Sequence, residues 1–301
     1  MNYRHAFHAG NFADVLKHTV VAVCIQRLNA KETPWRYIDT HAGIGLYDLD
    51  GDEAARSPEW RDGVGRILSA IGRAPQSVQD GMAAYLDAVR AVNEAGRLAS
   101  YPGSPVIAQG MARADDALRL CELHPESCAL LREAMGRDRR VKIEERNGYE
   151  ALSAYLPPPE RRGLVLVDPP FEEGTQARKL DFEKMLRAAR QAVKRWPQGI
   201  YIFWRPLKHL DAVEAFDGDL ATLLIEEMGL PPEKLLVADL WVKPLDESRM
   251  AGAGVVIVNP PWGLSSQLEV ILPWLAETLD QSAVGDPAGS GWRLVAPDAE
   301  G

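Results

Sequence analysis

Cysteine is scarce in this sequence. The three cysteines are scattered at positions 24, 121 and 128 of 301 residues. Each has apolar neighbours, which predicts buried free thiols and a reducing, cytoplasmic compartment. His124 lies between Cys121 and Cys128, but one histidine and two cysteines at this spacing fit no zinc template. We therefore expect no metal.

Long apolar runs are also missing. None approaches the ~20 residues that a membrane-spanning helix needs, and the first residues contain no hydrophobic core of a signal peptide. With 46% hydrophobic and 26% charged residues, the composition is that of a globular protein with one large or two modest domains. We expect no membrane partner.

Positive charge does not dominate the chain, whose formal net charge is −9. This argues against a protein that coats nucleic acid non-specifically, because such proteins are usually basic. Residues 178–208 nevertheless hold nine Lys or Arg against two acidic residues, a local sum of +7, and Arg137, Arg139 and Arg140 form a second cluster. Each cluster is either a binding face or a solvated helix surface.

Strands and helices are predicted to alternate along most of the chain. Apolar periodicity predicts strands over 35–39, 118–123, 141–144, 164–167, 200–204, 235–242 and 255–258, and helices over 14–28, 125–135, 149–156 and 181–196. This alternation is typical of a doubly wound α/β sheet. No long helix is predicted between the last two strands, which suggests an antiparallel hairpin at the sheet edge.

One stretch interrupts this alternation. Residues 48–98 are polar with two helical apolar stripes, which predicts a helical insertion subdomain. The main domain would then comprise residues 1–47 and 99–280. Residues 281–301 are rich in Gly, Asp and Pro and are expected to form a flexible tail. Ser104 and Pro105 are suited to the N-cap and first turn of a helix.

Asp168-Pro169-Pro170-Phe171 directly follows the predicted buried strand 164–167. It matches the Asp/Asn-Pro-Pro-aromatic signature of methyltransferases that modify amino nitrogens. The Asp168 carboxylate and the Pro169 carbonyl would accept both N–H groups of an exocyclic amine, which otherwise is a poor nucleophile. Phe171 would stack on a flipped base. The alternative is a simple turn, since proline often ends a strand.

Asn259-Pro260-Pro261-Trp262 also follows an apolar strand and is a rival for this role. The order of the strands favours Asp168. In a methyltransferase of this type, the amino-group acceptor follows the fourth strand, and Asp168 follows the fourth predicted parallel strand. Asn259 follows the predicted last strand, so we expect a structural role for it.

Other polar residues also lie where predicted parallel strands end, which is where α/β sheets bind ligands. The loop Asp39–Gly45 is glycine-rich, Glu122 is placed to accept two ribose hydroxyls, and Asn147 with Gly148 could read adenine nitrogens. Neither a G-x-G-x-x-G nor a G-x-x-x-x-G-K-S/T pattern occurs, which disfavours NAD and nucleoside triphosphates. S-adenosylmethionine, a polar ligand without phosphates, fits better.

The sequence resembles the RlmJ family of 23S rRNA adenine-N6 methyltransferases. Five blocks carry the resemblance over nearly the whole chain: residues 3–18 (YRHAFHAGNFADVLKH), 39–43 (DTHAG), 101–105 (YPGSP), 122–125 (ELHP) and 162–163 with 168–170 (RG and DPP). Residues 259–262 (NPPW) also match. The resemblance implies a Rossmann-like class I S-adenosylmethionine-dependent methyltransferase fold.

The resemblance also implies roles for individual residues. The S-adenosylmethionine site would comprise Lys17, His18, His41, Ser104, Glu122, Asn147, Gly148 and Asp168. Asp168, Pro169 and Phe171 would be catalytic, and Tyr3, Arg4, His5 and Phe171 would contact the substrate. Two positions depart from the family pattern: Phe171 stands where Tyr is frequent, and Asn147 stands where Asp is usual.

The implied substrate is a single adenine of 23S rRNA, adenine 2030, in protein-free or early-assembly rRNA. The chain would act as a monomer without an obligate protein partner, and the basic helix over 181–196 would meet the RNA backbone. A DNA adenine methyltransferase and a protein-glutamine methyltransferase share the motif, although a target-recognition domain and the typical N-P-P-Y are missing. A non-catalytic RNA-binding protein is disfavoured by the presence of both Glu122 and Asp168.

Overall fold

A single mixed sheet organises the molecule. The computed structural model describes residues 4–94, 96–171, 175–246, 250–283 and 289–295. Its eight-stranded sheet has the order β10-β8-β9-β7-β6-β1-β4-β5. The strands are β1 (Trp35–Asp39), β4 (Ala117–Glu122), β5 (Val141–Glu145), β6 (Arg162–Val167), β7 (Ile200–Pro206), β8 (Leu235–Trp241), β9 (Gly252–Val258) and β10 (Gly291–Val295). The five strands from β5 to β7 are parallel.

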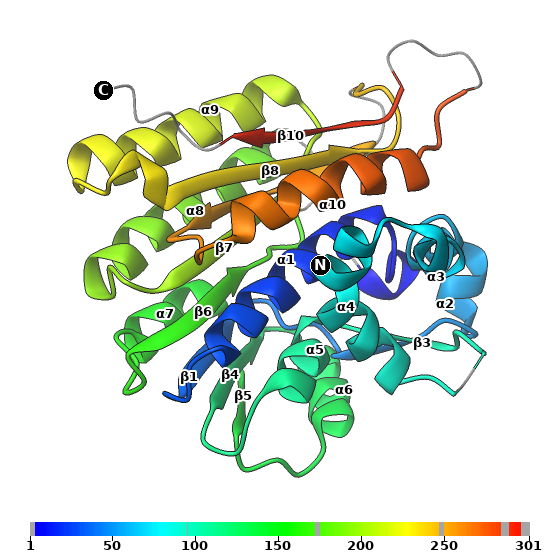
Figure 1. Ribbon diagram of the computed structural model, residues 1–301. Coiled ribbons are helices and arrows are strands. Elements are labelled where there is room, and N and C mark those ends of the chain that lie inside the picture. The colour runs from blue at the N-terminus through cyan, green and yellow to red at the C-terminus, as the bar shows by residue number, and fades with distance from the viewer. Residues whose placement is uncertain (1–3, 95, 172–174, 247–249, 284–288, 296–301) are drawn as a thin grey trace.

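Helices cover both faces of the sheet (Figure 1). One face carries α1 (Phe12–Asn29), α4 (Gln76–Ala91), α5 (Ser104–Met111), α6 (Pro125–Met135) and α10 (Leu264–Thr278), and the other carries α7 (Gly148–Tyr155), α8 (Thr175–Arg195) and α9 (Leu210–Ala221). Alternate residues of β6 serve the two sides: Leu164 and Leu166 join one hydrophobic cluster, and Val165 and Val167 the other. The period of two explains why this strand is apolar throughout.

Helix α1 is buried along most of its length between the sheet and the helices of its face. Asn11 caps it, because its side-chain oxygen accepts hydrogen bonds from the backbone N–H groups of Ala13 and Asp14. Even Lys17 and His18 are buried, with 4% and 1% of their surface exposed. A buried lysine requires partners, and they are found in the candidate site.

The helical insertion is joined to the main domain by a short second sheet. Strands β2 (Leu46–Asp48) and β3 (Ser100–Pro102) pair antiparallel and hold its two ends together. Between them, among the described residues, lie α2 (Asp52–Arg56), α3 (Val64–Ala70) and α4, with two short 3₁₀ turns. Their buried side chains, such as Val64 and Met82, belong to the same hydrophobic cluster as α1. The domain boundaries themselves stay a prediction.

The carboxyl-terminal part differs from the predictions in two respects. Strands β8 and β9 are antiparallel, as expected, but they are not the sheet edge, because β9 lies between β7 and β8. All seven residues of β9 are buried, which an interior position requires. The edge is β10, which pairs with β8 and includes residues 291–295 of the predicted flexible tail. Its alternating apolar residues are too few to stand out in a polar segment.

The basic segment 178–208 does not form one continuous surface. Arg205 is fully buried on β7, where it forms ion pairs with Asp239 of β8 and Asp217 of α9. Arg187 and Lys194 are exposed on α8, whereas Arg190 forms an ion pair with Glu227. Within the described ranges, no helix is both long and apolar enough to cross a bilayer.

Candidate active site

The sheet topology brings the predicted site residues together at the carboxyl ends of the parallel strands. The chain runs outward from β1 to β4 and β5, then returns to β6 and β7 on the other side. A crevice opens at such a reversal, at the carboxyl ends of the strands. A cavity of ≈ 700 Å³ lies there. It is lined by Arg4, His5, Lys17, His18, His41, Ser104, Glu122, Asn147, Gly148, Asp168, Pro169 and Phe171. Tyr3 lies outside the described residues.

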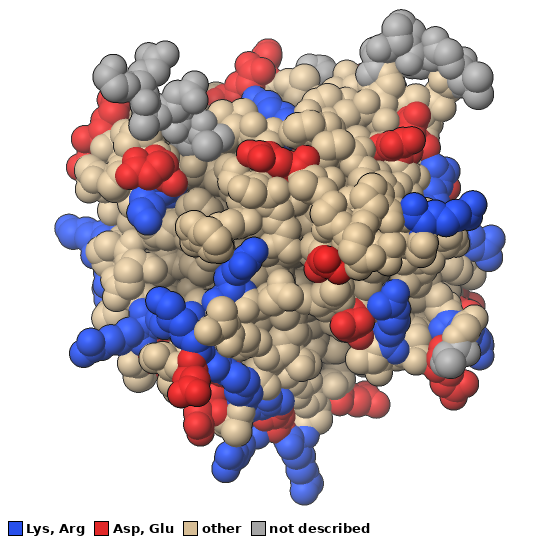
Figure 2. Space-filling model, in the orientation of Figure 1, with Lys and Arg blue, Asp and Glu red and all other residues tan. Residues whose placement is uncertain are grey.

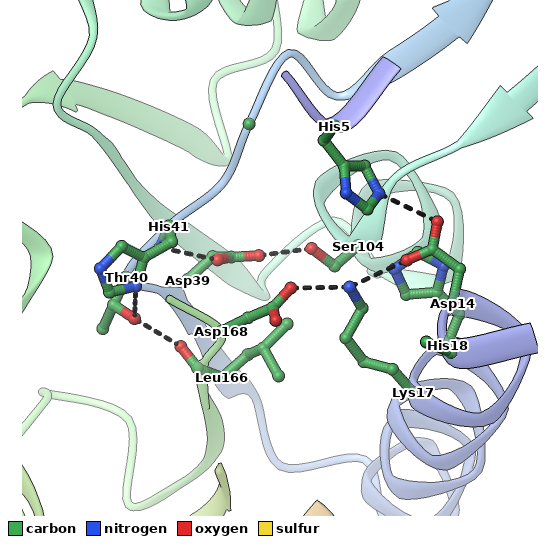
Figure 3. Close-up of polar contacts among 12 residues, drawn as sticks. His5, Asp14, Lys17, His18, Asp39, Thr40, His41, Ser104, Leu166 and Asp168 are labelled. Carbon is green, nitrogen blue, oxygen red and sulfur yellow. Dashed lines mark hydrogen bonds and ion pairs between the residues drawn. The ribbon is translucent and has the colours of Figure 1, made fainter. Parts of the chain in front are cut away.

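A chain of buried and partly buried ionisable side chains connects α1 to the end of β6 (Figure 3). The Lys17 ammonium donates to Asp168 Oδ2 at 2.6 Å and lies 2.9 Å from Asp14 Oδ1. The other Asp14 oxygen lies 2.9 Å from His5 Nε2 and accepts a hydrogen bond from Gly10 N–H at 2.9 Å. The Asp168 side chain thus has a fixed orientation, set by a residue that is 151 positions away in the sequence.

The charges in this chain stabilise one another. Burial opposes the charge on Lys17, but the carboxylates of Asp14 and Asp168 outweigh that effect and raise the pKa of Lys17. Burial also opposes the charge of Asp14, and the neighbouring His5 and Lys17 lower the pKa of Asp14 well below its ordinary value. Two carboxylates and one ammonium leave a net negative charge at the cavity wall, which suits a cationic ligand.

The loop after β1 forms the floor of the cavity. Asp39 is fully buried and accepts hydrogen bonds from Tyr37 Oη at 2.9 Å and Ser104 Oγ at 2.6 Å. Burial raises the pKa of Asp39 to about 6, although the hydrogen bonds from Ser104 and Tyr37 oppose the shift. Ser104 therefore does not cap α5, as its position before Pro105 had suggested; Gly103 is the N-cap residue. The nearby carboxylate is a stronger acceptor for its hydroxyl.

Glu122 and Asn147 occupy the ends of β4 and β5. Glu122 accepts backbone N–H groups from Gly43 and His124, both at 2.9 Å. Each carboxylate oxygen keeps lone pairs for further donors, such as ribose hydroxyls. The Asn147 side chain caps α7 by accepting from Tyr149 N–H. Gly148 has no room for a side chain, since a Cβ would lie 1.9 Å from Thr40 O.

Two aromatic side chains form the wall beside Asp168. Phe171, at a left-handed φ of 43°, contacts Phe182 and Trp204 edge-to-face, with centroids 5.1 and 5.7 Å apart. Lys17 Nζ lies 5.8 Å from the centroid of the Trp204 ring. The Trp204 Nε1 is buried and has no hydrogen-bond partner in the described part of the chain. An apolar wall with an unused donor is suited to a heteroaromatic ligand.

The two histidines of the predicted cofactor site are neutral at neutral pH. His18 Nδ1 lies 2.8 Å from Tyr101 Oη, and the two rings are stacked. His41 packs edge-to-face on Tyr149 and lies 2.8 Å from Thr40 Oγ1. Burial lowers the pKa of both histidines to about 3. Each reaches the cavity as an uncharged ring, with its orientation fixed by a hydroxyl.

The rival motif, Asn259-Pro260-Pro261-Trp262, lies at the opposite ends of the parallel strands, where those strands begin. Strand β9 runs antiparallel to β7, so Asn259 at its end lies beside the start of β7. The Asn259 side-chain amide donates to the carbonyls of Pro197 and Gly199, at 2.8 and 2.7 Å. These bonds support the structural role expected for Asn259.

Among the cavity-lining residues that were absent from the predicted site, Asp14, Tyr149 and Trp204 matter most for the chemistry. Asp14 stands three residues before Lys17, on the same face of a helix, and this spacing is the one signal that could have found it. Tyr149 contributes a buried hydroxyl without a hydrogen-bond partner in the described residues. In the sequence, Trp204 looks like a core residue of a strand, and only the packing reveals that it lines the cavity.

Fold and site together define a class I methyltransferase of the Asp-Pro-Pro-aromatic type. In the sheet, five parallel strands are followed by β9, which is antiparallel and lies between β7 and β8. The crevice lies where the strand order reverses. Asp168-Pro169-Pro170-Phe171 comes directly after β6, the fourth parallel strand in chain order.

The comparisons with known proteins identify the family. A family model described as ribosomal RNA large subunit methyltransferase D, RlmJ, matches residues 32–293. Ribosomal RNA large subunit methyltransferase J of Escherichia coli (strain K12) is 38% identical over 296 residues, covering 98% of each chain. The Haemophilus influenzae protein of the same name is 36% identical over 288 residues, covering 95% of this chain and 96% of the relative. The chain belongs to the RlmJ methyltransferase family.

A solved structure agrees in fold. Protein LPL1258 from Legionella pneumophila superposes with a TM-score of 0.84 at 28% sequence identity. The match covers 97% of this chain and 99% of the other. The architecture described above is therefore also found in a solved structure over nearly its full length.

Proposed function

We propose that this protein methylates the N6 amino group of one adenine in 23S rRNA, with S-adenosylmethionine as methyl donor. The target would be adenine 2030 in protein-free or early-assembly rRNA, and the enzyme would act as a cytoplasmic monomer. The observation that carries the proposal is the partly buried Lys17–Asp168 ion pair, which fixes the acceptor carboxylate of an Asp-Pro-Pro-Phe motif beside an aromatic wall.

The residues of the cavity fit S-adenosylmethionine. Glu122 would accept the ribose hydroxyls. The adenine would be contacted by the Asn147–Gly148 backbone and by the Tyr149 hydroxyl, which has no hydrogen-bond partner among the described residues. The net negative charge of Asp14, Lys17 and Asp168 would attract the sulfonium cation. When bound, S-adenosylmethionine supplies an electrophilic methyl group. No phosphate-binding element is needed, and the sequence has none.

The chain's own residues would orient the amine. Lys17 engages Asp168 Oδ2, and Asp168 Oδ1 has no donor among the described residues. Oδ1 and the Pro169 carbonyl are then available to accept the two amino hydrogens and favour a more tetrahedral nitrogen. Phe171 and Trp204 would hold the flipped base by stacking and edge contacts. The rate enhancement would come mainly from positioning and the exclusion of water.

The test is transfer of labelled methyl groups from S-adenosylmethionine to protein-free 23S rRNA, with duplex DNA alongside. We expect N6-methyladenine at a single rRNA site. Asp168→Ala should lose at least about 100-fold in kcat while its affinity for S-adenosylhomocysteine stays within a few-fold.

Asn259→Gly is the matched control, because it changes the rival motif and keeps a residue that tolerates the left-handed φ of 54°. It should retain the kcat of the wild type. Label on DNA or on protein instead of rRNA would reject the proposed substrate. An Asp168→Ala protein with wild-type turnover would reject the proposed acceptor.

A further inference from the structure

Trp262 is the most exposed large apolar side chain in the described residues, with 89% of its surface accessible. It ends the motif Asn259-Pro260-Pro261-Trp262, which the active site does not use. A single exposed tryptophan needs no explanation, unless the protein holds it in a defined position and surrounds it with complementary groups. Both conditions are met here.

The turn that presents Trp262 is held at several points. Asn259 N–H donates to Lys234 O at 2.7 Å, and its side-chain amide bonds the chain before β7. Two prolines then fix φ, and Gly263, at a left-handed φ of 80°, is the N-cap residue of α10. The indole is thus carried on a stiff support even though it gains little from burial.

One face of the indole lies close to a guanidinium. Arg27 Cζ, near the carboxyl end of α1, is 5.9 Å from the centroid of the Trp262 ring. Arg27 also donates to Gln267 of α10 at 3.2 Å, which fixes its position. In the part of the chain that the structure describes, no carboxylate forms an ion pair with Arg27. The Trp262–Arg27 platform therefore combines an exposed aromatic face with an uncompensated positive charge.

More positive charge lies next to Arg27. The guanidinium of Arg162 donates to the carbonyls of Leu28 and Thr33. Arg113 donates to the carbonyls of Lys31 and Thr33, but it also forms an ion pair with the buried Asp116, so its charge is largely compensated. In Figure 2, Lys and Arg gather at the lower left, where Figure 1 shows the end of α1 and the amino end of β1. Exposed acidic residues, Glu32 and Asp115, are interspersed, so the face is basic without being uniform.

We propose that the Trp262–Arg27 platform binds a single-stranded segment of the RNA substrate, away from the nucleotide that is methylated. A nucleobase would stack on the free face of Trp262, and the nearby guanidinium and ammonium groups would contact phosphates. The inference rests on the proposed function, because it requires an RNA substrate. An exposed aromatic within a basic surface favours nucleic acid over an apolar protein partner.

The position of the platform defines its role. It lies at the carboxyl end of α1, whereas Lys17 lies near the amino end; the ten residues from Lys17 to Arg27 span roughly 15 Å along the helix axis. It also lies where the parallel strands begin, whereas Asp168 lies where they end. It cannot touch the reacting atoms. It should therefore contribute to affinity and KM for long RNA and leave kcat unchanged.

The experiment measures binding of two labelled RNAs in the presence of S-adenosylhomocysteine. One is a long 23S rRNA fragment around the target, and the other is trimmed to the target and its immediate neighbours. Trp262→Ala should bind the long RNA about 5- to 150-fold more weakly, as expected for loss of one stacked base, and should raise KM by the same factor. Binding of the trimmed RNA and kcat should not change.

Two variants serve as controls. Trp262→Phe should restore most of the affinity, because it keeps a stacking face. Trp292→Ala removes another exposed tryptophan, on β10, and should behave as the wild type. Equal affinity of Trp262→Ala and wild type for the long RNA would overturn the proposal.

The remaining outcomes separate the two proposals. If the wild type binds and methylates rRNA while Trp262→Ala shows unchanged affinity and KM, only the platform is wrong. If the wild type does not methylate rRNA at all, the proposed function fails first. A wild-type dimer in sedimentation that dissociates in Trp262→Ala would assign the platform to a second copy of the chain and overturn RNA binding.

Discussion

Lys17 shows how a single buried charge can organise an active site. Taking an ammonium out of water is costly, and one carboxylate rarely compensates for it. Here two carboxylates flank it, at 2.9 Å from Asp14 and 2.6 Å from Asp168. Asp14 in turn is held by His5 and by a backbone N–H group. We infer that Asp14 is a positioning residue, acting on Asp168 through Lys17.

The first prediction is that Asp14→Asn lowers kcat about 10- to 100-fold, because it loosens Lys17 and hence Asp168. The pKa of Lys17 should fall, since Asp14 is one of the charges that raise it. The variant should then lose activity toward alkaline pH, where the wild type keeps Lys17 charged, and a merely structural defect would not cause this difference. Rates at several pH values and S-adenosylhomocysteine affinity test this; an unmoved profile would contradict it.

The second prediction concerns Asp39, whose pKa is raised to about 6 from an ordinary 3.8. The folded protein then holds this proton more tightly than the unfolded chain. The contribution of Asp39 to stability is therefore fully present below pH 4 and is lost as pH rises to about 6. Relative to Asp39→Asn, which does not titrate, the wild type should lose up to about 3 kcal/mol between pH 4 and pH 7.

Denaturant unfolding of both proteins across this range measures the difference. The other carboxylates titrate in both proteins, so their effects largely cancel in the comparison. If the difference in unfolding free energy between the two proteins stays constant with pH, the pKa of Asp39 is not raised.

At the scale of elements, α1 connects the two ends of the molecule. Its first turns carry Asp14, Lys17 and His18 to the cavity, and its last turn carries Arg27 to Trp262. Because α1 is buried along most of its length, its axial position relative to the sheet is fixed by packing. The site and the Trp262–Arg27 platform thus keep a constant separation.

Helix α8 supplies the third prediction. Arg187 and Lys194 are exposed on it, whereas Arg190 is engaged with Glu227. Reversing both charges, Arg187→Glu with Lys194→Glu, should weaken rRNA binding if the helix contacts phosphates. The slope of the logarithm of the RNA association constant against the logarithm of the salt concentration should become less steep by about 1.4, or about 0.7 for each lost phosphate contact.

A control is Arg90→Glu on α4, an exposed arginine that forms an ion pair with Asp87 and is not part of the basic segment. It should leave the salt slope unchanged. If the α8 variant also keeps the wild-type slope, its positive charges form a solvated surface and do not bind RNA.

At the scale of the whole molecule, the buried apolar side chains of the described residues form two hydrophobic clusters, one on each face of the sheet. Side chains of the insertion, such as Met82 and Tyr85, belong to the cluster that also contains α1 and the sheet. The insertion therefore lacks a core of its own, although its sequence reads as a separate helical unit.

The fourth prediction follows from this shared core: the chain should unfold in a single transition, with far-ultraviolet circular dichroism and tryptophan fluorescence coinciding. Met82→Ala should lower the unfolding free energy by about 2–5 kcal/mol without separating the two probes. S-adenosylhomocysteine at 100 times its Kd should add about 2.7 kcal/mol. A separate early transition would instead identify an independent insertion subdomain.

Much of this protein follows from local sequence. The apolar runs and their spacing predicted the parallel strands and the helices α1, α6, α7 and α8, because hydrophobic periodicity belongs to contiguous residues. They did not predict α9 or α10. Once strands and helices alternate, the carboxyl ends of the parallel strands meet at one edge. The convergence of Glu122, Asn147 and Asp168 on one cavity could be predicted for this reason.

Other features depended on which segments pack together. The sequence of β9 does not reveal that it enters between β7 and β8, and that of Arg205 does not reveal that it turns inward to Asp239. Strand pairing and buried ion pairs join residues far apart in the chain, so no local pattern encodes them. The Lys17–Asp168 pair, across 151 positions, exists only because α1 packs across the sheet at the end of β6.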